Sequence, residues 1–227
     1  QAAVRDRQAA RVPIFDRTKN VTPVPPFSWA SCKWRIVGVD PGGVDPTAVI
    51  PIGISQNERV HVFGEFYHRG APDTNRIADY ISTLGTVNIV VVDPSNPTMV
   101  SDLKRVDLPA YKANNDKAAR IAAVAGLLKS RRLTIDASCK NLLAELTTYW
   151  YAERKDMAGG AHGIETRTPK GHHADALDAL GYDVLALIAG IGATQEPRKL
   201  QWGAAKPNPN ETLKERLARR QREAARV

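Results

Sequence analysis

Hydrophobic residues fall in short blocks along the chain, and the spacing inside each block predicts a strand or a helix. Mostly apolar runs of strand length, bounded by turn-forming residues, occur at 35–39, 47–54, 60–67, 88–92, 108–111 and 133–135. Apolar residues three or four positions apart predict helices at 73–84, 96–105, 116–130, 141–150 and 172–189. The last of these helices has the most regular apolar stripe in the chain.

The order of these elements predicts an α/β fold. The first three strands follow one another with only short turns between them, which is typical of an antiparallel meander. From residue 73 onward, helices alternate with strands, which is typical of parallel pairing. We therefore expect a mixed five-stranded sheet, with three antiparallel strands followed by parallel ones and helices on both faces, as in a ribonuclease H-like fold.

The segments around this domain have a different composition. Residues 1–34 mix charged residues with a cluster of prolines, so we expect a linker or arm before a domain at 35–192. Residues 151–170 are rich in glycine, threonine and charge, and two alternatives are open for them, a β-hairpin or a loop. Residues 193–227 predict a basic flexible tail with a short helix at 211–226, which is either solvated or in contact with a nucleic acid or a partner.

Composition and charge narrow the function classes. No apolar run reaches the roughly 20 residues of a membrane-spanning helix, so we expect a soluble protein. The cysteines, Cys32 and Cys139, are too few for a disulfide framework or a zinc ribbon. A net charge of +8 favours a polyanionic partner. The linker-like start without an initiator methionine indicates a piece of a longer chain.

Acidic residues stand at the ends of two predicted strands and at the start of the last predicted helix. Asp40 and Asp93 each end an apolar strand and are each followed by proline, and Asp175 opens the last helix. If the first two strands are neighbours, their carboxylates lie about 5 Å apart, and the helix can place a third carboxylate over them. Oxygen ligands gathered in this way suit a hard divalent cation. Asp178, one helical turn after Asp175, and Asp45, in the turn after Asp40, are candidates for the same metal site.

Each acidic residue also has a structural interpretation. Asp40, Asp45 or Asp93 could serve only as turn residues, Asp175 could only complement the helix dipole, and Asp178 could form a salt bridge. Their coincidence favours a site for two Mg²⁺ or Mn²⁺ ions and hydrolysis of a phosphodiester. His173 could orient a water or a leaving group there. Because His172 and His173 are adjacent and no thiol accompanies them, a zinc site is disfavoured.

Basic residues near these acids are candidates for binding a phosphate backbone. They are Arg154 and Lys155 before the glycine pair at 159–160, Arg167 and Lys170 after it, and Lys104, Arg105 and Lys112 near the fifth strand. An exposed loop with mixed charge is the alternative for residues 151–170. The sequence has no GxxxxGK[ST] loop, which excludes a motor ATPase of that type within these residues.

Three motifs resemble one protein family. They are VGVDPGGVDPTAV at 37–49, VVVDPSNP at 90–97 and GHHADALDALGYDV at 171–184. Together they resemble the C-terminal nuclease domain of large terminase subunits, the DNA-packaging proteins of tailed bacteriophages, over roughly residues 35–189. The family's last helix begins like HDDxxDALxY, and this chain departs from that pattern at Ala174, where the first of two paired acids is common.

The resemblance implies a specific activity. Asp40, Asp93 and Asp175 would be the metal ligands of an endonuclease that cuts concatemeric double-stranded viral DNA at the start and end of packaging. An ATPase domain would precede Gln1, and residues 151–170 would form the hairpin beside the active site. The family also implies the capsid portal and a small terminase subunit as partners, and the cytoplasm of the bacterial host as the location.

Three other functions compete with this one. A Holliday-junction resolvase shares the VGVDPG motif and an acidic last helix. A catalytically silent domain of the same fold could serve as a DNA-binding or portal-docking module, although three intact carboxylates disfavour it. An actin-like kinase would need a DxGxT phosphate loop, and residues 40–43 lack the threonine.

Overall fold

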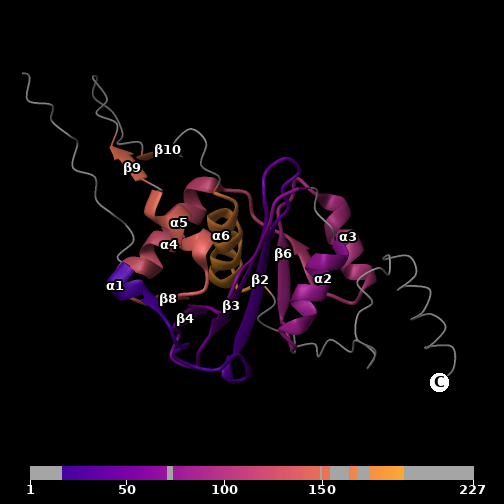
Figure 1. Ribbon diagram of the computed structural model, residues 1–227, viewed down its shortest axis with the longest axis horizontal. Coiled ribbons are helices and arrows are strands. Elements are labelled where there is room, and N and C mark those ends of the chain that lie inside the picture. The colour runs from indigo at the N-terminus through magenta and orange to yellow at the C-terminus, as the bar shows by residue number, and fades with distance from the viewer. Residues whose placement is uncertain (1–16, 71–73, 149, 154–163, 168–173, 192–227) are drawn as a thin grey trace, which may run out of the picture.

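A computed structural model describes residues 17–70, 74–148, 150–153, 164–167 and 174–191, and within them helices cover both faces of a central sheet (Figure 1). The strands are β1 Val21–Thr22, β2 Trp34–Asp40, β3 Thr47–Ile54, β4 Val60–Val62, β5 Phe66–His68, β6 Ile89–Val92, β7 Ala110–Lys112, β8 Leu133–Asp136, β9 Trp150–Glu153 and β10 Ile164–Arg167. The helices are α1 Arg17–Asn20, α2 Thr74–Thr83, α3 Pro97–Arg105, α4 Lys117–Lys129, α5 Lys140–Thr148 and α6 Asp175–Ile188, with a 3₁₀ turn at Trp29–Ser31.

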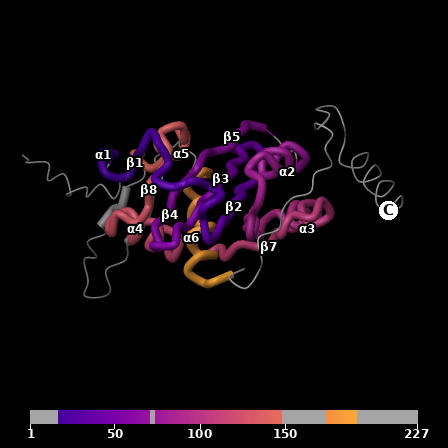
Figure 2. The backbone as a smooth tube through the Cα atoms, turned by 90° about the horizontal axis from the view of Figure 1, so that it is seen from below, coloured from indigo at the N-terminus to yellow at the C-terminus, as the bar shows by residue number. Residues whose placement is uncertain are grey.

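The main sheet contains the expected five strands at its centre. Strands β4, β3 and β2 pair antiparallel, and β6 and β7 continue the sheet parallel to β2. Three more strands bring the sheet to eight. Strands β8 and β1 extend it in parallel beyond β4, and β5 pairs with the other end of β3. Figure 2 shows the order from β8 through β4, β3 and β2 to β7. The predicted mixed α/β fold of the ribonuclease H-like type is confirmed.

Two hydrophobic cores lie on opposite faces of this sheet. Helices α4, α5 and α6 cover one face and α2 and α3 cover the other (Figure 1). Strand β2 alternates between the two cores, because Ile36 points to the α6 side while Val37 and Val39 point to the α2 side. This alternation decides on which face the residues at the ends of β2 and β6 lie.

The predicted strand at 60–67 is divided into β4 and β5. Pro51 stands in the facing part of β3 and has no N–H to donate, although its carbonyl accepts a hydrogen bond of 3.0 Å from Phe63 N–H. Across this point three steps along β3, from Val49 to Ile52, face four steps from Val62 to Phe66. The extra residue forms a bulge that ends one pairing register and begins another.

Several helix ends agree with the sequence signals. Asn96 and Asp116 cap α3 and α4 by accepting hydrogen bonds from backbone N–H groups three residues later, at 3.1 Å and 3.0 Å. Gly85 follows α2 with a φ of 82°, a conformation that favours glycine. The hairpin alternative for residues 151–170 is supported by the antiparallel pairing of β9 with β10. Its tip and the expected tail at 193–227 lie outside the described residues.

Residues 17–34, which we expected to belong to a linker, contact the domain. Strand β1 pairs with β8, and the Trp29 indole donates a hydrogen bond of 3.2 Å to the Thr86 carbonyl. The rings of Phe27 and Trp29 pack edge-on against Phe63, with centroids 5.7 Å and 5.2 Å away. These aromatic contacts attach the segment to the sheet.

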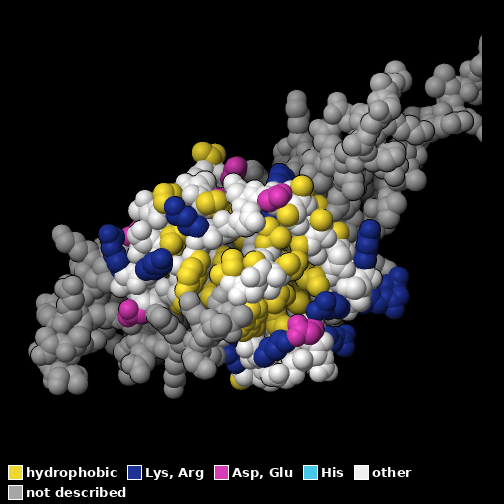
Figure 3. Space-filling model, turned by 180° about the vertical axis from the view of Figure 1, so that it is seen from behind, with side chains coloured by type: hydrophobic (Ala, Val, Ile, Leu, Met, Phe, Trp, Pro, Cys, Tyr) yellow, Lys and Arg dark blue, Asp and Glu magenta, His cyan; other side chains and the backbone are white. Residues whose placement is uncertain are grey.

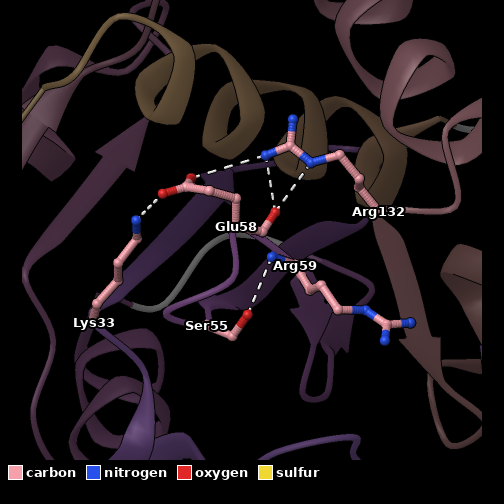
Figure 4. A network of polar contacts seen from close by, with 5 residues as sticks. All are labelled: Lys33, Ser55, Glu58, Arg59 and Arg132. Carbon is pink, nitrogen blue, oxygen red and sulfur yellow. Dashed lines mark hydrogen bonds and ion pairs between the residues drawn. The ribbon is translucent and has the colours of Figure 1, made fainter.

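A polar network closes the end of the sheet opposite Asp40 (Figure 4). Glu58, in the turn between β3 and β4, forms ion pairs with Lys33 and Arg132. The Arg132 guanidinium also donates two hydrogen bonds, of 2.9 Å and 3.1 Å, to the Glu58 carbonyl, and Arg59 N–H donates to the Ser55 hydroxyl at 3.1 Å. Because these residues are exposed, the network fixes the turn more than it stabilises the fold.

The described surface is mixed in character. Seen from behind, hydrophobic side chains gather at the centre of the face and Lys and Arg side chains lie around them (Figure 3). The large hydrophobic side chains that are exposed within the described ranges are Val24, Val44 and Ile188. Within the same ranges, no helix has the length and apolar character needed to cross a bilayer.

Candidate functional site

The ends of β2 and β6 bring the first two acidic residues together. The strands are parallel, Val39 pairs with Val92, and the N–H of Asp93 donates a hydrogen bond of 3.0 Å to the Val39 carbonyl. Val39 and Val92 both point into the α2 core, so Asp40 and Asp93, one residue further on, point to the α6 side. The protonated carboxyl of Asp40 donates a hydrogen bond to the carboxylate of Asp93.

Helix α6 lies directly on β2 because Gly38 has no side chain. A Cβ atom at this position would be 2.1 Å from the Ala179 carbonyl oxygen and 2.8 Å from a carboxylate oxygen of Asp183. This close approach sets the first turn of α6, with Asp175 and Asp178, over the strand ends. Four carboxylates therefore come from three elements to one edge of the sheet.

The electrostatics of Asp40 reflect this crowding. Burial raises the pKa of Asp40 to about 8, and the negative charges of Asp178, Asp93 and Asp175 and the hydrogen bond to Asp93 contribute to the increase. Three other acids lie close enough to Asp40 to add to the effect of burial, so acidic groups are concentrated at this edge. Such a site favours a cation.

Asp93 is oriented by contacts on two sides. One of its carboxylate oxygens accepts a hydrogen bond of 2.8 Å from Ser95 N–H, an Asx-type turn that leads into α3. The phenol of Tyr182, which is 2% exposed, donates a hydrogen bond to the same carboxylate group. Burial and the charges of Asp40 and Asp93 raise the pKa of Tyr182, so the phenol remains a donor.

Asp175 is positioned by a glutamate from another helix. The residue before α6 is Ala174, whose side chain cannot cap a helix. Glu145 of α5 takes this role, because one of its carboxyl oxygens accepts a hydrogen bond of 2.8 Å from Leu177 N–H. Burial raises the pKa of Glu145 to about 8, although hydrogen bonds from the backbone N–H groups of Leu177 and Ala176 oppose that increase. The Glu145 carboxyl is also hydrogen-bonded to Tyr67.

Asp178, a candidate metal ligand from its sequence position, is paired with a cation of the chain itself. The guanidinium of Arg120, from α4, donates a hydrogen bond of 3.1 Å to a carboxylate oxygen of Asp178. Burial raises the pKa of Asp178, and the charges of Arg120 and Lys117 oppose that increase. The salt-bridge alternative for Asp178 is thus present in the structure.

The other expected site residues lie at different distances from this edge. Asp45 is exposed in the turn between β2 and β3. Lys112 ends β7 opposite Val92, and so lies at the same edge as Asp93. Lys104 places its ammonium group 5.6 Å from the centre of the Tyr111 ring, and Arg105 forms an ion pair of 2.6 Å with Asp102. Arg167 is the last residue of β10, and His173, Arg154, Lys155 and Lys170 lie outside the described residues.

The donor chemistry of the site fits a divalent cation, although the ligands are not assembled in advance. Asp40, Asp93 and Asp175 offer only carboxylate oxygens, which Mg²⁺ and Mn²⁺ prefer. Within the described ranges, no three His, Cys, Asp or Glu side chains are grouped closely enough to hold a metal ion as they stand. Burial is the main cause of the raised pKa of Asp40, and a bound cation would remove the repulsion from the neighbouring acids that adds to it.

Sequence analysis missed the residues that hold the acids in place. Glu145, Tyr67 and Arg120 each reach the site from an element distant in the sequence. Glu145 stands in a helix without any motif, and Arg120 looked like an ordinary charged residue of α4. The signal available in the sequence was a charged residue on the apolar face of the predicted helix. In the structure Arg120 is 4% exposed.

Comparisons with known proteins agree on one family. Residues 37–187 match the family model described as Terminase RNaseH-like domain. No curated protein matches the chain in sequence.

Solved structures with a similar fold include phage terminases. The large terminase of the thermophilic bacteriophage D6E is similar with a TM-score of 0.62 and 21% identity, over 78% of this chain and 45% of that one. The P22 large terminase nuclease domain is similar with a TM-score of 0.59 and 14% identity, over 83% of this chain and 95% of that one. The nuclease domain of the SPP1 large terminase, solved with bound Mn, is similar with a TM-score of 0.53 and 17% identity, over 72% of this chain and 93% of that one. At these identities the likeness establishes the fold, and the chain spans under half of the D6E protein.

Proposed function

The chain belongs to the family of terminase RNaseH-like domains, and we propose that it is a divalent-cation-dependent endonuclease that cleaves double-stranded DNA during packaging of a viral genome. The observation that carries this proposal is the meeting of Asp40, Asp93 and Asp175 at one sheet edge, where burial and mutual repulsion raise the pKa of Asp40 to about 8. The Mn bound to the SPP1 domain supports the choice of cation.

The roles of the residues follow from their positions. Asp40 and Asp93 would hold the cations from the strand ends, and Asp175 from α6. When bound, two Mg²⁺ or Mn²⁺ ions would activate a water and stabilise the leaving 3′ oxygen of the phosphodiester. Glu145 fixes the first turn of α6, and Tyr182 orients Asp93, so the chain supplies ligands whose directions are set by packing. Asp45 would contribute through water, and His173 would orient a water or the leaving group.

The DNA would lie across the same edge of the sheet. Lys112 beside Asp93 and Lys117 near Asp178 provide positive charge there, and the net charge of +8 favours a phosphate backbone. Arg154, Lys155, Arg167 and Lys170 of the hairpin segment would add contacts from one side, and Lys104 and Arg105 from α3. Contacts of this kind position DNA without reading its sequence, which suits a nuclease of limited sequence specificity.

The larger context is part of the proposal. The chain spans 45% of the D6E large terminase, which suits a nuclease domain that works beside an ATPase domain of the same full-length protein. We place the nuclease domain at 35–192, preceded by a linker in 1–34 whose residues 17–34 pack against the domain, and followed by a basic tail at 193–227. The capsid portal and a small terminase subunit are the proposed partners, and the host cytoplasm the proposed location.

Cleavage of supercoiled plasmid tests this function. The wild-type chain should nick and linearise plasmid with Mn²⁺ or Mg²⁺ and be inactive in EDTA. Asp40→Asn and Asp93→Asn should each lower the rate by at least about a hundredfold, since they remove a proposed metal ligand without changing shape. Asp107→Asn is the matched control, because Asp107 is exposed and its φ of 62° is one that asparagine adopts readily.

Four results would contradict the proposal. Cutting that survives EDTA would exclude the cations, and equal loss in all three variants would exclude a specific role for Asp40 and Asp93. A folded wild type that binds DNA without cutting it would favour a docking module. A strong preference for four-way junctions over linear duplex would favour a resolvase.

A further inference from the structure

Arg120 is a buried cation beside the carboxylate cluster. It comes from the first turn of α4, is 4% exposed, and donates one hydrogen bond of 3.1 Å to Asp178 and another of 3.1 Å to the side chain of Asn115. Asp178 keeps 25% of its side-chain surface exposed. A buried guanidinium without a counter-ion is strongly unfavourable, so Arg120 needs the negative charge of Asp178.

Helix α6 has a glycine at the point where the Arg120 side chain packs against it. Gly181 lies under it, and a Cβ atom at position 181 would be 2.9 Å from the Arg120 Cβ and 3.1 Å from its Cδ. The guanidinium carbon lies 4.2 Å from the centre of the Tyr182 ring, at cation–π distance. Since the phenol of Tyr182 donates to Asp93, Arg120 contacts one acid directly and reaches a second through one ring.

From these contacts we propose that Arg120 is a positioning residue that keeps Asp178 out of the metal-ligand set. The inference rests on the proposed metal-dependent function of the same site. Of the four acids at this edge, Asp178 is then the counter-ion of Arg120, and Asp40, Asp93 and Asp175 are left for the cations. The positive charge of Arg120 also reduces the net negative charge of the site, which limits how tightly a metal ion binds.

Two opposing effects on Mn²⁺ affinity test this role. Asp178→Asn leaves the Arg120 charge unpaired and should weaken Mn²⁺ binding by about tenfold. Arg120→Met frees the Asp178 charge and should strengthen binding several-fold. The double variant Arg120→Met with Asp178→Asn removes both charges, and we expect its affinity to return to within about threefold of the wild type. Titration calorimetry with Mn²⁺ on the whole chain, without DNA, measures all four.

Two further variants control for folding and for net charge. Replacing both members of a buried ion pair with neutral groups is well tolerated in general, so the double variant should fold even where Arg120→Met alone does not. Lys129→Met removes one positive charge from the exposed last turn of the same helix and should leave the affinity unchanged. Thermal melting of each variant reports whether it is folded.

The outcomes separate the inference from the function on which it rests. If Asp178→Asn and the double variant lose the same affinity, Asp178 is a metal ligand and the inference is wrong. If Arg120→Met, folded, binds Mn²⁺ more weakly than the wild type, the proposed charge balance is also wrong. A wild type that binds no Mn²⁺ overturns the proposed function and this inference with it, whereas wild-type binding without the opposing effects overturns the inference alone.

Discussion

Asp40 and His61 are two side chains for which burial in the fold disfavours the charged form. Asp40 lies among other acids, and His61 is buried between the rings of Phe27 and Phe63, with its Nδ1 2.9 Å from the Thr134 hydroxyl. Burial lowers the pKa of His61 to about 4, although the charge of Asp136 opposes that decrease. Both groups therefore link stability to pH, in opposite directions.

Asp40→Asn should stabilise the metal-free protein at high pH. The pKa of Asp40 is about 8 in the folded chain, against 3.8 for an ordinary aspartate, so between these values the folded state keeps a proton that the unfolded state has lost. The wild-type stability therefore falls as the pH rises from about 4 to about 8, and asparagine removes that loss. We expect a gain on the order of 1–3 kcal/mol at pH 8 and above, by urea unfolding in EDTA. Parallel pH profiles of the two proteins would contradict the crowding of acids.

His61→Phe should make the domain less sensitive to acid. The folded pKa of about 4 lies below the ordinary 6.5, so between these values the unfolded state binds a proton that the folded state does not. The wild-type stability is therefore lost as the pH falls from about 6.5 to about 4, by up to about 3 kcal/mol, and phenylalanine keeps the ring packing without titrating. Urea unfolding between pH 4 and 7 should give a smaller slope for the variant, and an unchanged slope would show that His61 is not the group responsible.

Packing between helices and strands decides whether these side chains meet. The acids at the ends of β2 and β6 could be predicted from sequence, because strand ends and the in–out alternation are local properties. Their partners could not, because Glu145 and Arg120 reach the site only through the way α5 and α4 pack against α6. The division of the strand at 60–67 also depends on Pro51 in the neighbouring strand, and a pattern within one segment does not show that neighbour.

Gly38→Ala tests the contact of α6 with β2. The added Cβ would lie 2.1 Å from the Ala179 carbonyl oxygen, and because both partners are backbone, α6 must move away. We expect a loss of about 2–3 kcal/mol in urea unfolding and weaker Mn²⁺ binding, since Asp175 moves with the helix. Gly43→Ala is the matched control, because a Cβ there meets no atom within 4 Å. Similar effects of the two substitutions would exclude a special role for the close approach.

Glu145→Ala and Glu145→Gln separate the cap of α6 from its charge. With a pKa of about 8, Glu145 is largely uncharged at pH 7, and glutamine retains an acceptor for the Leu177 N–H. Alanine should therefore cost about 1–2 kcal/mol and weaken Mn²⁺ binding, whereas glutamine should keep most of both. Urea unfolding and calorimetry at pH 7 give the comparison, and equal losses in the two variants would argue against the capping role.

The domain as a whole is organised around one edge of its sheet. The aromatic contacts of residues 17–34 attach that segment at the far end of the sheet, and the network at Glu58 fixes the turn there. Helix α6 crosses the sheet so that its first turn reaches the acids. The five central strands were predictable, because consecutive strands with tight turns and alternating helices define them. The pairings of β1, β5 and β8 were not, since each joins segments without a local signal of contact.

The decisive experiment is a crystal structure of this domain soaked in Mn²⁺, with the ions located by anomalous scattering. The proposed site predicts Mn²⁺ held by Asp40 and Asp93 from the strand ends and by Asp175 from α6, while Asp178 stays paired with Arg120. Mn²⁺ bound at another place, or no Mn²⁺ at this edge at concentrations that support cleavage, would contradict the site.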